Sequence, residues 1–178
     1  MKKDTFSSTI TQKILDFLCD HLQESFFSAQ IAFETSLSKG GVNQALRKLA
    51  QEGFLKAEKK GRMIFYQVEA RSPVVKQYKI LKNVSLLQPL VERLKALSER
   101  VVLFGSSAFG EDTGQSDIDI YVVSGNAQAV KDLVILRSPF KRKAQLVLKT
   151  PAQDIALDKK EPVFYNEVKK GIVLWQKQ

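Results

Sequence analysis

Two short apolar runs in the second half of the chain constrain the fold most, because polar residues are attached to each of them. Residues 101–104 form a continuous apolar run, the pattern of a buried strand, and lead directly into the small residues 105–107. In residues 116–123, two aspartates alternate with isoleucines. Because the side chains of a strand alternate between its faces, Asp117 and Asp119 are expected on one face and the isoleucines in the core. The pattern predicts two buried strands, the second of which carries acidic groups on one face.

The turn after the first run, Gly105-Ser106-Ser107, is predicted to bind an anion such as a phosphate. A strand followed by a small-residue turn and a helix start directs backbone N–H groups and the positive end of a helix dipole to one point, and the serine hydroxyls add donors. The carboxylates of Asp117 and Asp119 repel each other unless a cation lies between them. Carboxylate oxygens suit Mg²⁺, which completes its coordination with water and substrate phosphates. The turn and the carboxylate pair are therefore predicted to form one site.

The turn Gly105-Ser106-Ser107 followed by Ser116-Asp117-Ile118-Asp119 resembles the signature of the DNA polymerase beta-type nucleotidyltransferase superfamily, in particular its minimal members. The resemblance covers about residues 85–178. It implies an NTP as substrate or ligand, held by Gly105, Ser106 and Ser107. It also implies that Asp117 and Asp119 are the catalytic and metal-binding carboxylates, which hold Mg²⁺, as two ions in an active enzyme.

This chain departs from the family pattern at the third carboxylate. Active members usually carry it on a later strand, and the candidate strand here, residues 144–148, has Gln145 at the expected position. An amide supplies no negative charge to a metal and cannot act as a general base. Asp154 and Asp158 are expected to be surface charges rather than substitutes, and Phe109 stands where minimal members commonly carry an arginine. Catalysis is therefore left open.

The end of the chain predicts further elements of the same domain. Helices are expected to open at residues 150–151 and at Pro162, and a last strand is expected over residues 172–175. The basic run Lys141-Arg142-Lys143 precedes the strand of Gln145. This run is predicted either to reach phosphate or nucleic acid, or to be a solvated turn before an edge strand.

The first 70 residues predict three helices followed by a β-hairpin. Apolar residues at helical spacing predict a helix over residues 8–21, and serine caps predict two more, over residues 28–34 and 39–52. Ser38 is the cap of the third helix. Residues 54–68 are expected to form a hairpin whose turn is basic and contains a glycine.

Three helices and a basic-tipped hairpin resemble the winged helix-turn-helix family of DNA-binding domains, over about residues 5–70. The resemblance implies that double-stranded DNA is the partner, that the third helix enters the major groove, and that the hairpin is the wing. The implied DNA contacts are Lys39, Asn43, Gln44 and Arg47 on the helix and Lys59, Lys60 and Arg62 on the wing. Gly40 and Gly41 lower the intrinsic stability of the helix and would allow close approach to a sugar-phosphate backbone. Dimerisation or protein contact through the winged helix is the alternative.

The charge of the chain also favours a polyanionic partner. Its 178 residues contain 28 Lys and Arg against 19 Asp and Glu, a net charge of +9. The excess is largest in residues 71–100, where a solvated basic helix is the other explanation. Because Arg71-Ser72-Pro73 breaks the pattern, the predicted organisation is a DNA-binding domain over residues 1–72, a connecting basic helix over 73–84 and a nucleotidyltransferase-like domain over 85–178.

The expected fold class is α+β, with a winged helix followed by a small mixed-sheet domain. We expect a cytoplasmic protein without a membrane partner, because no apolar run is long enough to cross a bilayer and the first residues lack the pattern of a secretory signal. Cys19 is the only cysteine, so an internal disulfide is excluded. A homodimer would match a palindromic DNA site.

Three functions remain compatible with the sequence. The first is a DNA-binding transcriptional regulator whose second domain binds a nucleotide with Mg²⁺ as a signal. The second is an active nucleotidyltransferase that moves a nucleoside monophosphate onto a hydroxyl of a protein, small molecule or nucleic acid. The third is a structural role, in which the second domain only dimerises the DNA-binding part.

Overall fold

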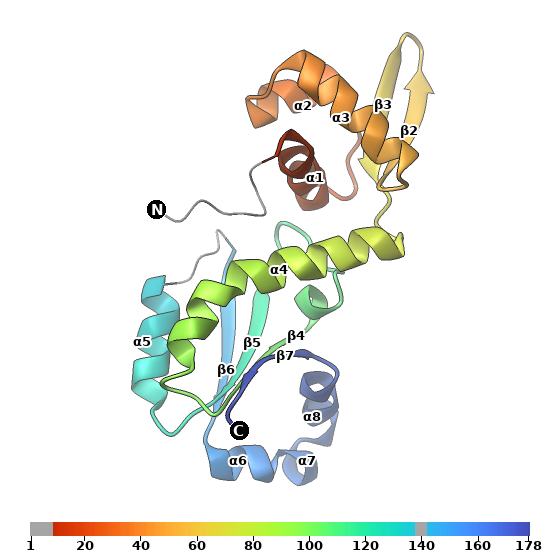
Figure 1. Ribbon diagram of the computed structural model, residues 1–178. Coiled ribbons are helices and arrows are strands. Elements are labelled where there is room, and N and C mark those ends of the chain that lie inside the picture. The colour runs from red at the N-terminus through yellow and green to blue at the C-terminus, as the bar shows by residue number, and fades with distance from the viewer. Residues whose placement is uncertain (1–8, 138–141) are drawn as a thin grey trace. The chain divides into compact units, whose positions relative to one another are not determined.

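The protein forms two compact units, Met1–Tyr78 and Lys79–Gln178, in a computed structural model that describes residues 9–137 and 142–178 (Figure 1). Each unit has its own sheet and its own apolar core. The fold class is α+β, as expected. None of the helices in the described ranges combines the length and the apolar composition that crossing a bilayer requires.

The first unit contains three helices and a three-stranded antiparallel sheet of order β1-β3-β2. Its elements are α1 (Ile10–Asp20), β1 (Phe26–Phe27), α2 (Ser28–Thr35), α3 (Lys39–Gln51), β2 (Leu55–Lys60) and β3 (Met63–Val68). The three helices and the hairpin of β2 and β3 lie where the sequence predicts them. Strand β1 was not predicted, because its two residues are too few to show a pattern and are defined only by pairing with β3.

Local signals explain the limits of these elements. Thr9 and Gln12 form a reciprocal capping box at the start of α1, and the Ser38 hydroxyl accepts a hydrogen bond from the Gly41 N–H at the start of α3. Gly61, at φ +62°, makes the tight hairpin turn between β2 and β3. The buried faces of α1, α2 and α3 meet in one core that includes the fully buried Leu46.

A single helix, α4 (Pro73–Leu94), includes both the predicted connecting helix over 73–84 and the residues 85–89, whose pattern in the sequence indicates the start of a second helix. Pro89 was expected to lie near a helix start, because proline lacks the N–H that a helix interior uses. In the structure it lies inside α4, between the buried Leu87 and Leu90. Burial of these leucines outweighs the local preference of the proline, so the helix continues through it.

The second unit is built on a four-stranded mixed sheet of order β6-β5-β4-β7. Its strands are β4 (Arg100–Phe104), β5 (Ile118–Val123), β6 (Ala144–Lys149) and β7 (Ile172–Gln176). β4 pairs antiparallel with both β5 and β7, whereas β5 and β6 are parallel and are connected through α5 (Ala127–Arg137). The four strands were predicted and α5 was not.

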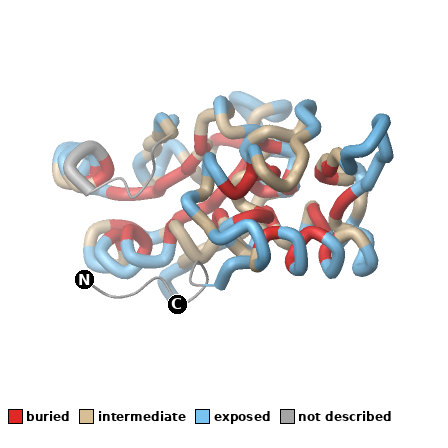
Figure 2. Tube along the Cα trace, turned by 90° about the horizontal axis from the view of Figure 1, so that it is seen from above, coloured by how far each residue is buried: buried red, intermediate tan, exposed pale blue. Residues whose placement is uncertain are grey.

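Helices cover both faces of this sheet, and buried residues follow its strands (Figure 2). α4 and α5 pack on one face, with Leu90, Leu103 and Ile120 in the shared core. Three short helices pack on the other face, with Phe104 and Tyr121 in a second core. They are α6 (Pro151–Ile155), α7 (Leu157–Lys160) and α8 (Pro162–Lys169).

Candidate functional site

The turn after β4 lies directly against the acidic strand β5. Phe104 is the register partner of Asp119, so Gly105 follows at the end of the paired segment. Gly105 has a φ of +66°, and a Cβ atom there would collide with the Oδ2 atom of Asp119. Glycine is therefore required at this position for two reasons: the backbone conformation and the closeness of the Asp119 carboxylate. The structure thus joins the small-residue turn and the carboxylate pair at one end of the sheet.

The segment after Gly105 differs from the expected helix start. It is one 3₁₀ turn, η1 (Ser106–Ala108), and Gly110 at φ +65° ends it. Three residues do not build a helix dipole, so that part of the predicted anion binding is corrected. The N–H groups of Phe109 and Glu111 both donate to the carbonyl of Ser106, at 3.2 and 3.0 Å. The half-buried Ser106 remains at the surface of the turn.

Ser107 connects the turn to its surroundings. The residue is fully buried, and its hydroxyl donates to the carbonyl of Asp117 at 3.5 Å. Its own carbonyl accepts a hydrogen bond from Nδ2 of Asn83 on α4 at 3.1 Å. Ser107 was expected to contact a ligand, but the structure gives it a role in holding the turn to the start of β5.

The two aspartates lie as the alternation predicts. Ile118 and Ile120 are fully buried, whereas Asp117 and Asp119 are partly exposed on the face that α8 covers. Asp117 immediately precedes β5, and Asp119 lies within it. Burial raises the pKa of Asp119, and the charges of Asp117 and Glu167 raise it further. A cation beside these carboxylates would therefore be stabilised.

Gln145 occupies the position next to Asp119 on the neighbouring strand. The two residues are direct register partners in the parallel pair of β5 and β6, and Gln145 is exposed. An amide thus stands where a third carboxylate would face the other two. Within residues 9–137 and 142–178, no cluster of three or more His, Cys, Asp or Glu side chains is placed to hold a metal ion.

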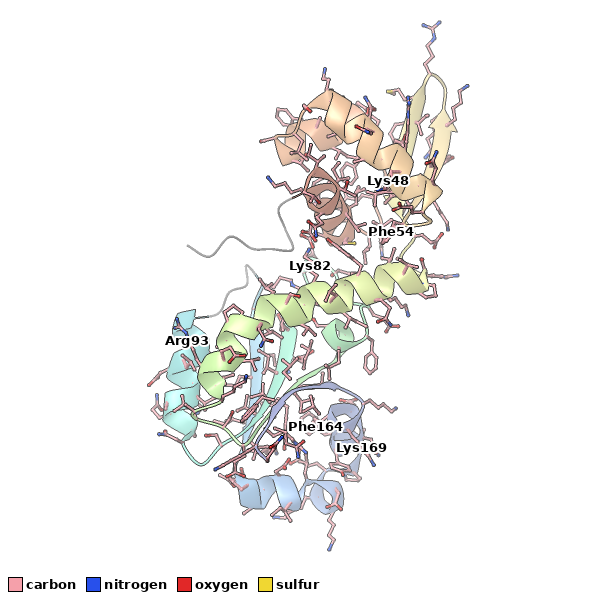
Figure 3. The ribbon with its side chains drawn as sticks, in the orientation of Figure 1. Lys48, Phe54, Lys82, Arg93, Phe164 and Lys169 are labelled. Carbon is pink, nitrogen blue, oxygen red and sulfur yellow. The ribbon has the colours of Figure 1, made fainter. Side chains whose placement is uncertain are left out.

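Glu167 is an acidic residue near the site that the sequence analysis missed. It lies on α8, three residues after Phe164, which Figure 3 labels. The ring of Phe164 packs on that of Phe104, with 5.7 Å between the centroids. Val168 is buried against the same core. Because Phe104 and Asp119 are register partners, α8 brings Glu167 close enough to influence the Asp119 carboxylate. A helical projection from Pro162 onward was the signal that could have identified it.

Buried charged groups around the turn were also missed. Lys79 on α4 donates to the carbonyl of Asp112 and lies 3.5 Å from its carboxylate. Arg142 donates to the same carboxylate at 2.5 Å, to the carbonyl of Thr113 at 3.0 Å and to Oδ1 of Asn83 at 2.9 Å. Lys79 therefore does not belong to a solvated basic face.

The basic run and the later aspartates can now be assigned. Arg142 is engaged within the protein, which corrects the expectation that it reaches phosphate or forms a solvated turn, whereas Lys143 is exposed and Lys141 lies outside the described residues. Asp158 is an exposed charge, as expected. Asp154 is not: it accepts hydrogen bonds from Arg100 at 2.7 Å and from the buried Tyr121 at 2.6 Å.

A second candidate surface lies on α3 in the first unit. Its exposed face carries mainly polar residues, and Lys48, labelled in Figure 3, belongs to this face. The residues of this face are Gly40, Asn43, Gln44, Arg47, Lys48, Gln51 and Glu52. Lys39 is exposed at the start of the helix. Gly41 packs under Ile10 of α1, whereas a Cβ atom at Gly40 would meet open space.

The tip of the hairpin is basic and exposed. Lys59 ends β2 together with Lys60, and Arg62 follows Gly61 in the turn. Lys60 lies 3.1 Å from the Glu58 carboxylate and 5.4 Å from the centre of the Phe65 ring. The predicted wing residues are therefore all accessible to a ligand, as are the predicted residues of α3.

Residues 90–178 match the family described as polymerase beta, nucleotidyltransferase. No curated protein matches the chain. A solved structure described as a predicted nucleotidyltransferase from Sulfolobus solfataricus is 18% identical, with a TM-score of 0.41, over 60% of this chain and 92% of that one. A predicted transcriptional regulator from Rhodococcus sp. RHA1 is 16% identical (TM-score 0.34; 54% of this chain, 38% of that one). The archaeal chromatin protein TrmBL2 is 15% identical (TM-score 0.33; 93% and 72%).

Proposed function

Because the chain belongs to the polymerase beta nucleotidyltransferase family, we propose that its second unit binds an NTP together with Mg²⁺ and that its first unit binds double-stranded DNA. The chain would then act as a DNA-binding regulator that responds to a nucleotide. The observation that supports the nucleotide part most directly is the approach of Gly105 to Asp119, which joins the turn and the carboxylates in a single site.

The donor set of this site fits Mg²⁺. Asp117 and Asp119 offer carboxylate oxygens on one partly exposed face, and Mg²⁺ takes one or two carboxylates and completes its octahedron with water and phosphate oxygens. When bound, the ion would neutralise negative charge on the phosphates of the nucleotide. The close approach of Gly105 to Asp119 places the turn next to the carboxylates, and the half-buried Ser106 hydroxyl can donate to a phosphate there.

Gln145 supports binding without transfer. Nucleotidyl transfer requires a hydroxyl to attack the α-phosphate, and a carboxylate at the attacking side can orient that hydroxyl and accept its proton. The amide of Gln145 can orient a hydroxyl through a hydrogen bond but cannot accept the proton at neutral pH. Its place beside Asp119 in the sheet therefore favours a regulator over an enzyme.

Glu167 supports the second candidate, an active nucleotidyltransferase. The charge of the exposed Glu167 on α8 acts on Asp119, so a third acidic group lies near the pair, although the three are not placed to hold a metal ion together. An enzyme of this kind would transfer a nucleoside monophosphate to a hydroxyl and release pyrophosphate. Loss of pyrophosphate release in Glu167→Gln, with Mg²⁺-dependent NTP binding retained, would select this candidate.

The exposed groups of α3 and the hairpin support DNA as the partner of the first unit. Asn43, Gln44 and Arg47 carry the donors and acceptors that read base edges in a major groove, and all three are exposed on α3. Lys59, Lys60 and Arg62 carry positive charge suited to phosphates. We propose α3 as the reading helix and the hairpin as the wing.

Calorimetric titration of Mg²⁺ with each common NTP tests the nucleotide part. We expect Mg²⁺-dependent binding by the unchanged protein and its loss in an Asp117→Asn, Asp119→Asn double variant. Asp158→Asn serves as the matched control, because it removes an equal charge from an exposed position on α7. Absence of NTP binding by the unchanged protein would leave DNA recognition as the function and the second unit as a scaffold.

A further inference from the structure

We propose that Asn83 and Arg142 are positioning residues that fix the Gly105–Ser107 turn from the side opposite the ligand. This inference rests on the proposed nucleotide site and adds to it the groups that hold its shape. Neither residue faces the carboxylate pair. Both act through backbone carbonyls of the segment that runs from the turn to β5.

Asn83 links the turn to Arg142 by using both ends of its amide. Its Nδ2 donates to the carbonyl of Ser107, and its Oδ1 accepts from Nη2 of Arg142 at 2.9 Å. The residue is 2% exposed, so neither group has water as an alternative partner. An amide is the side chain that supplies a donor and an acceptor in one plane. Replacement by aspartate would keep the acceptor and lose the donor.

Arg142 fixes the far end of the same segment. Its Nη1 donates to the Asp112 carboxylate at 2.5 Å and to the Thr113 carbonyl, while Lys79 bonds the Asp112 carbonyl. The side chains of Lys79 and Asp112 are each 6% exposed. Two residues of α4 and one residue just before β6 therefore hold the segment at Ser107, Asp112 and Thr113. The hydrogen bond from the Ser107 hydroxyl to the Asp117 carbonyl connects this segment to the start of β5.

The cost of burying such groups indicates that the network acts on conformation. Burying Lys79 and Asp112, and Arg142 in part, carries a penalty that ion pairing only roughly offsets, so these ion pairs add little net stability. Such a network does define one conformation, because each donor has a specific acceptor. A turn held in place before binding loses less entropy when a phosphate binds. The network of Lys79, Asn83, Asp112 and Arg142 thus holds the turn in its binding conformation before a ligand arrives.

The chain offers a matched control in the cluster of Arg100, Asp154 and Tyr121. Arg100 is 26% exposed against 17% for Arg142, and it pairs with Asp154 at 2.7 Å. It lies at the start of β4, whereas the turn follows the end of that strand. Arg100→Lys and Arg142→Lys both keep the charge and lose the forked hydrogen bonds of a guanidinium. Only Arg142→Lys removes hydrogen bonds that hold the segment after the turn.

The test compares Arg142→Lys and Asn83→Asp with Arg100→Lys in the full chain. Three quantities are measured: thermal stability, affinity for inorganic triphosphate with Mg²⁺, and hydrogen exchange of the amides in residues 105–116. We expect Arg142→Lys and Asn83→Asp to weaken triphosphate binding by about tenfold or more and to accelerate exchange in this segment. Arg100→Lys is expected to lower thermal stability while leaving both other quantities within about twofold of the unchanged protein.

Two results would overturn the inference. One is unchanged affinity and exchange in both network variants, and the other is an equal loss in Arg100→Lys. If the unchanged protein binds no triphosphate, the proposed function fails, and hydrogen exchange alone then decides whether the network fixes the turn. Asn83→Asp keeps the inference falsifiable if Arg142→Lys does not fold.

Discussion

At the scale of single residues, the negative charge of Asp119 lowers the stability of the folded state. Folding raises the pKa of its carboxyl, mainly by burial and then through Asp117 and Glu167. Such a carboxyl is protonated more readily in the folded state, so its contribution to stability falls as the pH rises above the ordinary aspartate range. We therefore expect Asp119→Asn to raise the melting temperature at pH 7 in the absence of divalent metal, with a smaller gain near pH 4.

Thermal unfolding at the two pH values measures this effect, and Asp158→Asn is the control. Asp158 is exposed on α7, so its replacement should leave the melting temperature nearly unchanged at both pH values. A stability gain from Asp119→Asn that is as large near pH 4 as at pH 7 would contradict the electrostatic explanation, because an uncharged aspartic acid is not repelled.

Gly105 provides a second prediction at this scale. Gly105→Ala must place a side chain at φ +66° and ψ −161°, a backbone region essentially confined to glycine, which costs about 1–3 kcal/mol, and must also displace the Asp119 carboxylate. Gly61→Ala is the comparison for a side chain at positive φ without a clash, because nothing lies within 4 Å of its added Cβ. We expect urea denaturation to give the larger loss of unfolding free energy for Gly105→Ala. Equal losses would show that the approach to Asp119 carries no energetic consequence.

At the scale of elements, α3 is the place where DNA recognition can be tested. If Arg47 reads a base, we expect Arg47→Ala to weaken a sequence-selective duplex complex by about 1–3 kcal/mol. If Arg47 contacts a phosphate, we expect the slope of log affinity against log salt concentration to fall in magnitude by about one. Fluorescence anisotropy at several salt concentrations measures both. Lys169→Ala is the control, because Lys169 is an exposed cation on α8 of the second unit.

Equal affinity for all duplexes, unaffected by Arg47→Ala, would contradict DNA reading by α3. Binding of the first unit to a protein or to a second copy would then be the explanation to pursue. Gly40 adds a related signal, because no atom of the described residues lies within 4 Å of a Cβ added there, whereas Gly41 is needed where Ile10 packs.

Elements with a periodic pattern were predictable from the sequence, and elements defined by pairing or by tertiary burial were not. The alternation around Asp117 and Asp119 correctly predicted β5, and the cap at Ser38 correctly predicted the start of α3. Helix α4 could not be predicted as one element, because burial of its leucines outweighs Pro89. The partners of Arg142 were also beyond prediction, since they lie 30 and 59 residues away in sequence.

At the scale of the whole molecule, the division of α4 between two cores is the feature with the clearest consequence. Val75 belongs to the core of the first unit, whereas Leu87, Leu90 and Leu94 belong to that of the second. Each core is otherwise built from residues of its own unit. Each unit therefore has an apolar core and a sheet of its own, as an independently folding domain requires.

We expect two overlapping fragments that both retain α4, residues 1–94 and 73–178, to fold separately. Circular dichroism should show a cooperative thermal transition for each, because each keeps a complete core and sheet. Fragment 73–178 retains Lys79, Asn83 and Arg142, so it should bind magnesium triphosphate with the affinity of the full chain. A matched fragment beginning at residue 85 keeps the four strands but loses Lys79 and Asn83. Equal triphosphate affinity in the two fragments would mean that the start of the helix has no part in shaping the turn.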